Sequence, residues 1–218
     1  MAWVEAAVVL YLRTLTGRIE PYQANPLPEF GGLERPEMIR EAATLIMLLA
    51  VGWLAGRTSR TRLAYSLIAF GVWDIFYYVF LRVLTGWPHS LGDWDILFLL
   101  PLPWWGPVLA PVSIALLMIL WGTIVTQAER SAAATCHGWR VLVLSFSGMA
   151  VALFVFMADA IRVVGHGREA LRATLPVLFN WPLFLFGLSL MAAPIIDLGW
   201  QRIGRRRLIA VATEVNSN

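Results

Sequence analysis

The chain has 218 residues, of which 59% are hydrophobic and 14% charged, and its formal net charge is +3. A soluble domain averages about 45–50% apolar and about 25% charged residues, so this composition indicates an integral membrane protein. All 17 basic residues are Arg, which excludes Schiff-base chemistry on Lys and therefore a retinal protein. These Arg residues lie in short loops between apolar segments, as membrane orientation requires, so we expect no nucleic-acid partner.

The N-terminal segment, residues 1–16, is apolar but short, and Glu5 and Arg13 interrupt it. It favours an interfacial helix anchored by Trp3 over a membrane span, although a span is the alternative. Glu5 stands where a signal peptide would be basic, so we expect no cleaved signal. Residues 17–36 are rich in Pro and Gly and predict a loop.

Five apolar segments follow, each compared with the roughly 20 residues that a bilayer needs. The connector 86–106 is too rich in Pro and Trp to be a sixth span, and residues 93–100 within it predict a short interfacial helix or re-entrant turn. The expected fold is all-α: a single transmembrane domain over residues 1–218, with five spans, or six if residues 1–16 insert. The predicted spans are residues 38–56, 63–85, 107–127, 141–164 and 174–198.

The distribution of Arg predicts the orientation. Three segments that five spans would place on one side carry most of the Arg residues, whereas the connector 86–106 carries none. The positive-inside rule then places the N-terminus outside and the C-terminus in the cytoplasm. The loop that contains Arg168 and Arg172 deviates from this pattern. The Arg residues that set the orientation are Arg57, Arg60, Arg62, Arg130, Arg140, Arg202, Arg205, Arg206 and Arg207.

Charged residues inside the spans suggest a site near the outer side. An Asp at the centre of a span costs roughly 2.5–3.5 kcal/mol, so Asp74 needs an internal partner or a function. Two helical stripes, 74/77/78/82 and 159/162/166, would face one another around a polar cavity that opens outward. The candidate ligand-binding residues are Glu41, Asp74, Tyr77, Tyr78, Arg82, Asp159 and Arg162.

Two other interpretations of these charges stay open. The acids and arginines could simply neutralise one another and fix the helix register, or Asp74 or Asp159 could act as an acid–base group. A metal site is a weaker candidate, with hard-oxygen and imidazole ligands from His89, Asp93, Asp95 and His166 but no local motif to support it. Haem is not favoured because the three His residues all fall in loops or at span ends.

The motifs WDIFYY, GWPHS, WDILFL and PWWGPV resemble a family of bacterial multi-spanning membrane proteins that has no assigned activity. The resemblance implies a bacterial inner-membrane protein and no particular reaction. We therefore expect a non-enzymatic membrane protein with a small outward-facing site for an ion, metal or small ligand. The alternatives are an accessory subunit of a larger membrane complex, with partner subunits in the bilayer, and a membrane-embedded enzyme that acts on a lipid-like substrate.

Overall fold

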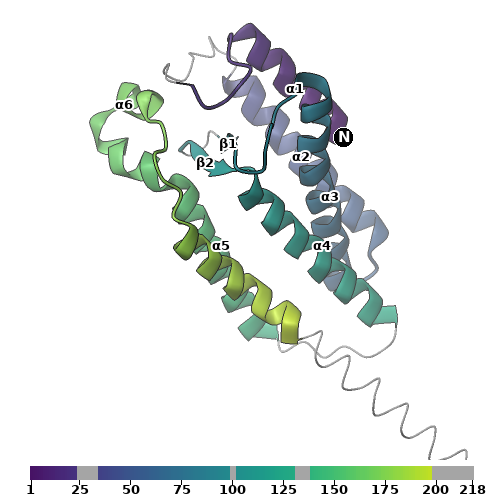
Figure 1. Ribbon diagram of the computed structural model, residues 1–218. Helices are drawn as coiled ribbons and strands as arrows, with labels where there is room; N and C mark the ends of the chain where they lie inside the picture. The colour runs from purple at the N-terminus through teal and green to yellow at the C-terminus, as the bar shows by residue number, and fades with distance from the viewer. Residues whose placement is uncertain (24–33, 99–101, 131–137, 198–218) are drawn as a thin grey trace, which may run out of the picture.

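The computed structural model describes residues 1–23, 34–98, 102–130 and 138–197. These residues form a helical bundle to which one small sheet is attached (Figure 1). The elements, in chain order, are α1 (Ala2–Leu15), α2 (Glu34–Ala55), α3 (Ser59–Thr85), β1 (Trp94–Phe98), β2 (Trp104–Pro107), α4 (Leu109–Arg130), α5 (Gly138–Val163), the 3-10 turn η1 (Val164–His166), α6 (Arg168–Ala173) and the closing helix Trp181–Asp197.

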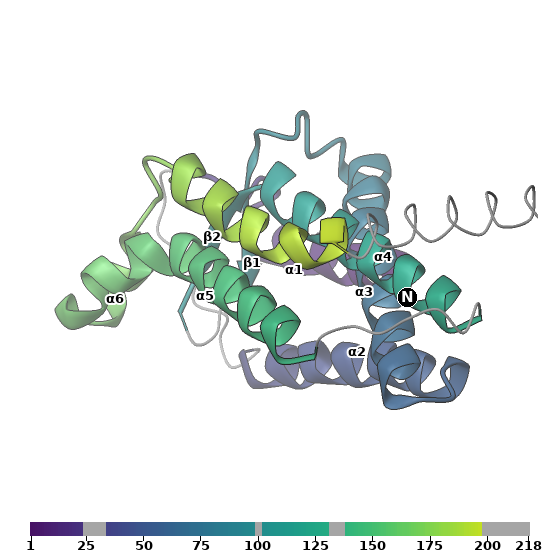
Figure 2. The same cartoon turned by 90° about the horizontal axis from the view of Figure 1, so that it is seen from below.

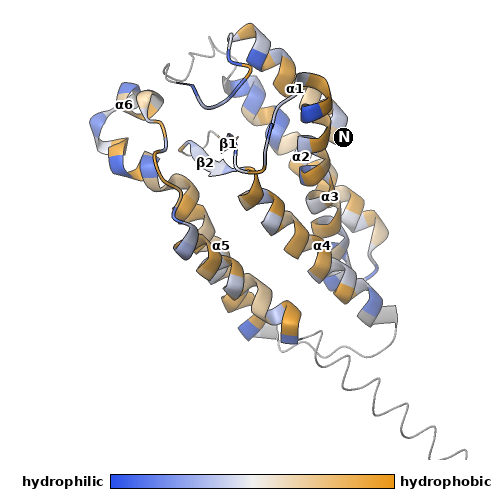
Figure 3. Cartoon of the chain, in the orientation of Figure 1, coloured by the Kyte–Doolittle hydropathy of each residue, from blue (hydrophilic) through white to orange (hydrophobic). Residues whose placement is uncertain are grey.

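Among the described residues, four helices are long and apolar enough to cross a membrane, namely α2, α3, α4 and α5. Their apolar residues follow the length of the bundle, and the hydrophilic residues collect toward its two ends (Figure 3). The predicted spans 38–56, 63–85 and 141–164 match α2, α3 and α5 to within one residue at their C-terminal ends, whereas the span 107–127 begins two residues too early, because Pro107 belongs to β2. The closing helix has 17 described residues and is shorter than the other four.

The predicted fifth span begins too early in the chain. Residues 174–180 are not helical, and the closing helix starts at Trp181. The side chain of Asn180 accepts a hydrogen bond from the backbone N–H of Leu183 at 3.2 Å, which is the geometry of a helix N-cap. A polar cap inside an apolar segment therefore sets the boundary, and hydrophobicity alone did not indicate it.

The expected short helix in the connector is wrong, because the structure has two antiparallel strands there. β1 and β2 pair with Trp94 opposite Pro107 and Ile96 opposite Trp105. The aromatic and β-branched side chains of this segment favour strands, and its Pro residues exclude a long helix. We call β1 and β2 the connector sheet, and the end of the bundle that carries it the sheet end.

Close backbone contacts join the helices in two groups. A Cβ atom at Gly71 would lie 2.6 Å from the carbonyl oxygen of Ala115, so α3 and α4 touch through their backbones. Gly148 of α5 has the same relation, at 2.5 Å, to the carbonyl oxygen of Gly187 in the closing helix. Small residues at such crossings are typical of helix packing in membranes.

One group therefore contains α1 to α4, and the other contains α5 and the closing helix, which lie side by side in both views (Figure 1 and Figure 2). α1 packs on α3, where Ala6 is buried against Tyr78 and Leu81. The connector sheet links the two groups, since Phe156 of α5 packs directly on Gly106 of β2. Residues 1–16 thus form a helix, as predicted, and that helix is part of the first group's core.

Candidate functional site

A cavity of about 750 Å³ lies between the two helix groups. Its polar lining comes from α1, α2, α3, β1 and the segment after α1, all at or toward the sheet end. The lining from α4, from residues 141–156 of α5 and from the closing helix carries no charged side chain, and Ser145 supplies its only hydroxyl group among the described residues. The charged residues and tyrosines that line the cavity are Glu5, Arg13, Arg18, Glu37, Arg40, Glu41, Asp74, Tyr77, Tyr78 and Asp95.

An ion pair between Arg13 and Asp95 closes part of the sheet end. Arg13 Nη2 lies 2.9 Å from Asp95 Oδ1, and the two side chains are 12% and 1% exposed. Asp95 also accepts the backbone N–H of Ile96 at 2.9 Å. Burial raises the pKa of Asp95, whereas Arg13, the Ile96 amide and the nearby Tyr78 hydroxyl oppose that rise. The pair fixes α1 to β1 at the rim of the cavity.

A second group of charges surrounds Arg40 on α2. Its Nε donates to Glu37 Oε2 at 2.9 Å, a second nitrogen donates to the other Glu37 oxygen, and a third contact goes to Glu5 of α1. Glu37 lies in the first turn of α2, where the helix dipole favours a carboxylate. Glu41, one turn further along α2, has no hydrogen bond or ion pair with any residue that the structure describes.

Asp74 lines the cavity at the middle of α3, as the sequence placed it near mid-span. Within the described ranges its carboxylate makes no hydrogen bond. Aromatic rings on its own helix lie beside it. Trp73 stacks on Tyr77 with ring centroids 6.4 Å apart, and Phe70 lies 5.5 Å from Trp73.

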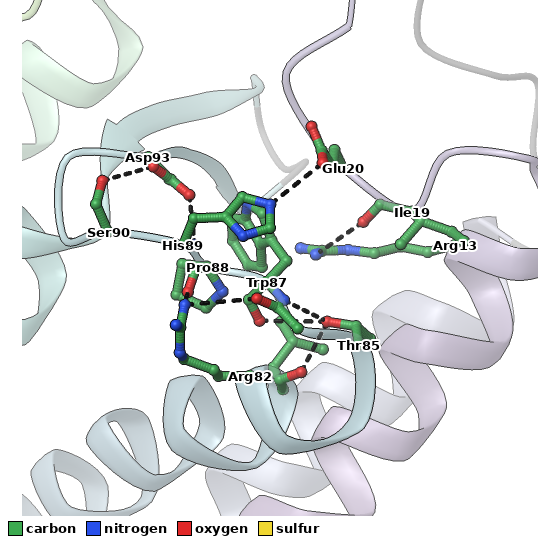
Figure 4. Close-up of polar contacts among 12 residues, drawn as sticks. Arg13, Ile19, Glu20, Arg82, Thr85, Trp87, Pro88, His89, Ser90 and Asp93 are labelled. Carbon is green, nitrogen blue, oxygen red and sulfur yellow. Dashed lines mark hydrogen bonds and ion pairs between the residues drawn. The ribbon is translucent and has the colours of Figure 1, made fainter.

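The other predicted ligand residues do not join this cavity. Arg82 donates to the backbone carbonyl oxygens of Gly86 and Pro88 and so stabilises the end of α3 (Figure 4). Asp159 pairs with Arg162 at 3.2 Å, and Arg162 is 77% exposed. None of these three residues lines the cavity. The structure therefore separates the predicted stripe on α5 from the stripe on α3.

The four metal candidates are also dispersed. Asp93 accepts hydrogen bonds from the Ser90 hydroxyl at 2.6 Å and from the backbone N–H of His89 at 2.7 Å (Figure 4). These bonds lower the pKa of Asp93 although partial burial opposes them. The His89 ring contacts Glu20, and His166 is exposed. No three His, Cys, Asp or Glu side chains gather around a metal-sized space within the described residues.

Sequence reasoning missed the contribution of α1 to the site. Glu5 and Arg13 were treated as interruptions of an interfacial helix, yet both line the cavity as ion-pair partners. Their spacing of eight residues, with Val9 between them, places all three on one helical face. This stripe was the sequence pattern from which the contribution of α1 to the cavity could have been predicted. Arg18 was also missed: it donates to the carbonyl oxygens of Pro21 and Gln23, and burial lowers its pKa.

The indole N–H groups of Trp73 and Trp104, two residues that line the cavity, are buried with no hydrogen-bond partner among the described residues. An unsatisfied buried donor costs about 1–3 kcal/mol. These atoms are covered by protein, so they add to the cost of building the site and offer no direct ligand contact.

Comparison of the chain with family models, with curated proteins and with solved structures gave no match. The resemblance of its Trp-rich motifs to bacterial multi-spanning proteins therefore stays an expectation.

Proposed function

We propose that this chain is an integral membrane protein that binds a small, largely apolar ligand in the cavity between its two helix groups. The observation that carries the proposal is the lining, which has charged groups at one end and apolar side chains over the remaining length. A volume of about 750 Å³ lies within the range of about 300–1,000 Å³ typical of small-molecule sites.

A ligand with a polar group and one flexible apolar chain would match both parts of this lining.

Access from the bilayer supports an apolar ligand. Leu142, Phe146 and Met149 of α5 line the cavity and are also exposed, at 52%, 61% and 44%. The cavity is therefore not sealed along α5, and an apolar molecule dissolved in the membrane could enter between the helices. The proposed setting is a bacterial inner membrane, with the sheet end outside and the C-terminus in the cytoplasm.

Catalysis is a less well-supported function. The enzyme hypothesis used Asp74 or Asp159 as an acid–base group. Of these two only Asp74 lines the cavity, and no second acid–base group of the described residues forms a hydrogen bond or ion pair with it. Asp159 pairs instead with an exposed Arg at the end of α5. We therefore propose binding, and no reaction.

The experiment is native mass spectrometry of the protein, released from micelles after incubation with dodecanol. We expect a one-to-one adduct in the wild type. Met149→Trp adds bulk inside the cavity and should abolish the adduct, whereas Val143→Trp, on an exposed residue of α5 outside the lining, should retain it. Equal adducts in both variants, or none in the wild type, would contradict the proposal.

A further inference from the structure

We infer that the ligand of this cavity is a single-chain amphiphile with an organic cation as its head group. The head lies against Asp74 and its aromatic neighbours, and the tail extends toward the end opposite the connector sheet. This inference rests on the proposed function and adds the chemical class of the ligand.

The first argument is the charge balance of the lining. Five carboxyl groups, those of Glu5, Glu37, Glu41, Asp74 and Asp95, share the cavity with the guanidinium groups of Arg13, Arg18 and Arg40.

Each of these three guanidinium groups has other partners in the structure. Arg13 pairs with Asp95, and Arg40 pairs with Glu5 and Glu37. Arg18 binds backbone carbonyl oxygens. Glu41 and Asp74 thus remain without a paired cation in the described part of the chain. An ionised carboxylate away from water and without a counter-charge is costly, so a ligand that brings a positive charge gains free energy at this site, and a ligand with a negative charge loses it.

The second argument is the aromatic surface around Asp74. Phe70, Trp73 and Tyr77 follow one another about one turn apart on α3, the Trp73 ring contacts the other two rings, and all three residues line the cavity. The faces of aromatic rings attract cations, and quaternary ammonium groups are bound in this way. Helix α3 alone therefore offers two interactions that attract a cation, one with the carboxylate of Asp74 and one with the three aromatic rings.

The third argument distinguishes an amphiphile from a free ion. The described residues hold no cluster of three metal-type ligands, and most of the lining carries no polar group. A bare cation would leave the apolar part unfilled, whereas an alkyl chain would occupy it. Burial of apolar surface is worth about 25 cal/mol for each Å², so the tail supplies affinity and the head supplies selectivity and orientation.

The test compares three probes with the same alkyl chain and different heads: dodecyltrimethylammonium, dodecanol and dodecanoate. Binding to the full chain in lipid nanodiscs is measured by titration calorimetry, with empty nanodiscs as the blank for partition into lipid. We expect dodecyltrimethylammonium to bind at least about tenfold more tightly than dodecanol, and dodecanoate to bind most weakly. Asp74→Asn should remove most of this preference and Glu41→Gln a smaller part. Dodecanol should still bind both variants, which shows that they are folded.

Glu169→Gln is the matched control, because Glu169 is exposed on α6 outside the cavity; it should keep the wild-type preference. Equal affinity for dodecyltrimethylammonium and dodecanol, with both lost in Met149→Trp, would overturn the cationic head and leave the proposed function standing. A preference that survives Asp74→Asn combined with Glu41→Gln would also overturn it. Failure of all three probes to bind the wild type would overturn the proposed function as well.

Discussion

At the scale of single residues, the structure contains two ion pairs that differ in burial and in sequence separation. Asp159 and Arg162 form a pair three residues apart on one helix, and the Arg is largely exposed. Arg13 and Asp95 lie 82 positions apart, and Asp95 is almost completely buried. A solvated pair contributes at most about 1 kcal/mol, whereas breaking a buried pair costs about 3–5 kcal/mol.

This contrast gives a prediction for a double-mutant cycle. Arg13→Met should lower the free energy of unfolding by about 3–5 kcal/mol because it leaves Asp95 buried without a counter-charge. Arg13→Met combined with Asp95→Asn should recover a large part of that loss. Stability is measured by thermal and denaturant unfolding in micelles. The Asp159→Ala and Arg162→Ala pair serves as the control and should be nearly additive; an additive Arg13/Asp95 cycle would contradict the buried pair.

The sequence could predict some of these residues and not others, for a physical reason. Asp74 was identifiable because a charge in the middle of an apolar helix is expensive wherever that helix lies. Arg13 was not, because its partner comes from a strand far along the chain, and no helical spacing relates the two. The sequence therefore placed charged residues of α5 in the cavity, whereas the structure lines it with charged residues of α1 and α2.

At the scale of elements, close contacts between backbones decide how the helices pair. Gly148→Ala should raise helix propensity by about 1 kcal/mol. However, the new Cβ would lie 2.5 Å from the Gly187 carbonyl oxygen and would push the closing helix away from α5. Overpacking of this kind costs about 1–3 kcal/mol, so we expect net destabilisation in thermal unfolding. Gly165→Ala, which meets no atom within 4 Å, is the control; a stabilised Gly148→Ala would contradict the contact.

The elements also show where reasoning from hydrophobicity is sufficient. Four long apolar segments predicted four helices because length and composition determine them locally. The connector was misassigned because its Trp residues suit both a membrane interface and a strand. The pairing of β1 with β2 depends on their register against one another and on Phe156 of α5, and neither is a local property of the chain.

At the scale of the whole molecule, the cavity gives the two ends of the bundle different chemistry. Charged side chains occupy the sheet end of the cavity, and apolar ones occupy the other. In a bilayer this asymmetry would place the ligand's head in the leaflet on the side of the connector sheet. Which leaflet that is depends on the orientation of the bundle, so the topology determines whether the site serves molecules from the outer or the inner side.

The Arg distribution predicts that the sheet end lies outside the cell, and two serines allow a matched test of this orientation. Ser90 lies in the connector and Ser59 begins α3 at the opposite end, and both are exposed. Each is replaced by Cys in a Cys136→Ser background, which removes the single native thiol. Ser90→Cys should react with a membrane-impermeant maleimide in intact cells. Ser59→Cys should react only after lysis, because three Arg residues near it favour the cytoplasm.

A reporter fused after Asn218 should likewise be cytoplasmic. The reverse labelling would place the charged end of the cavity inside and would contradict the proposed outward-facing site, although the cavity itself would be unchanged.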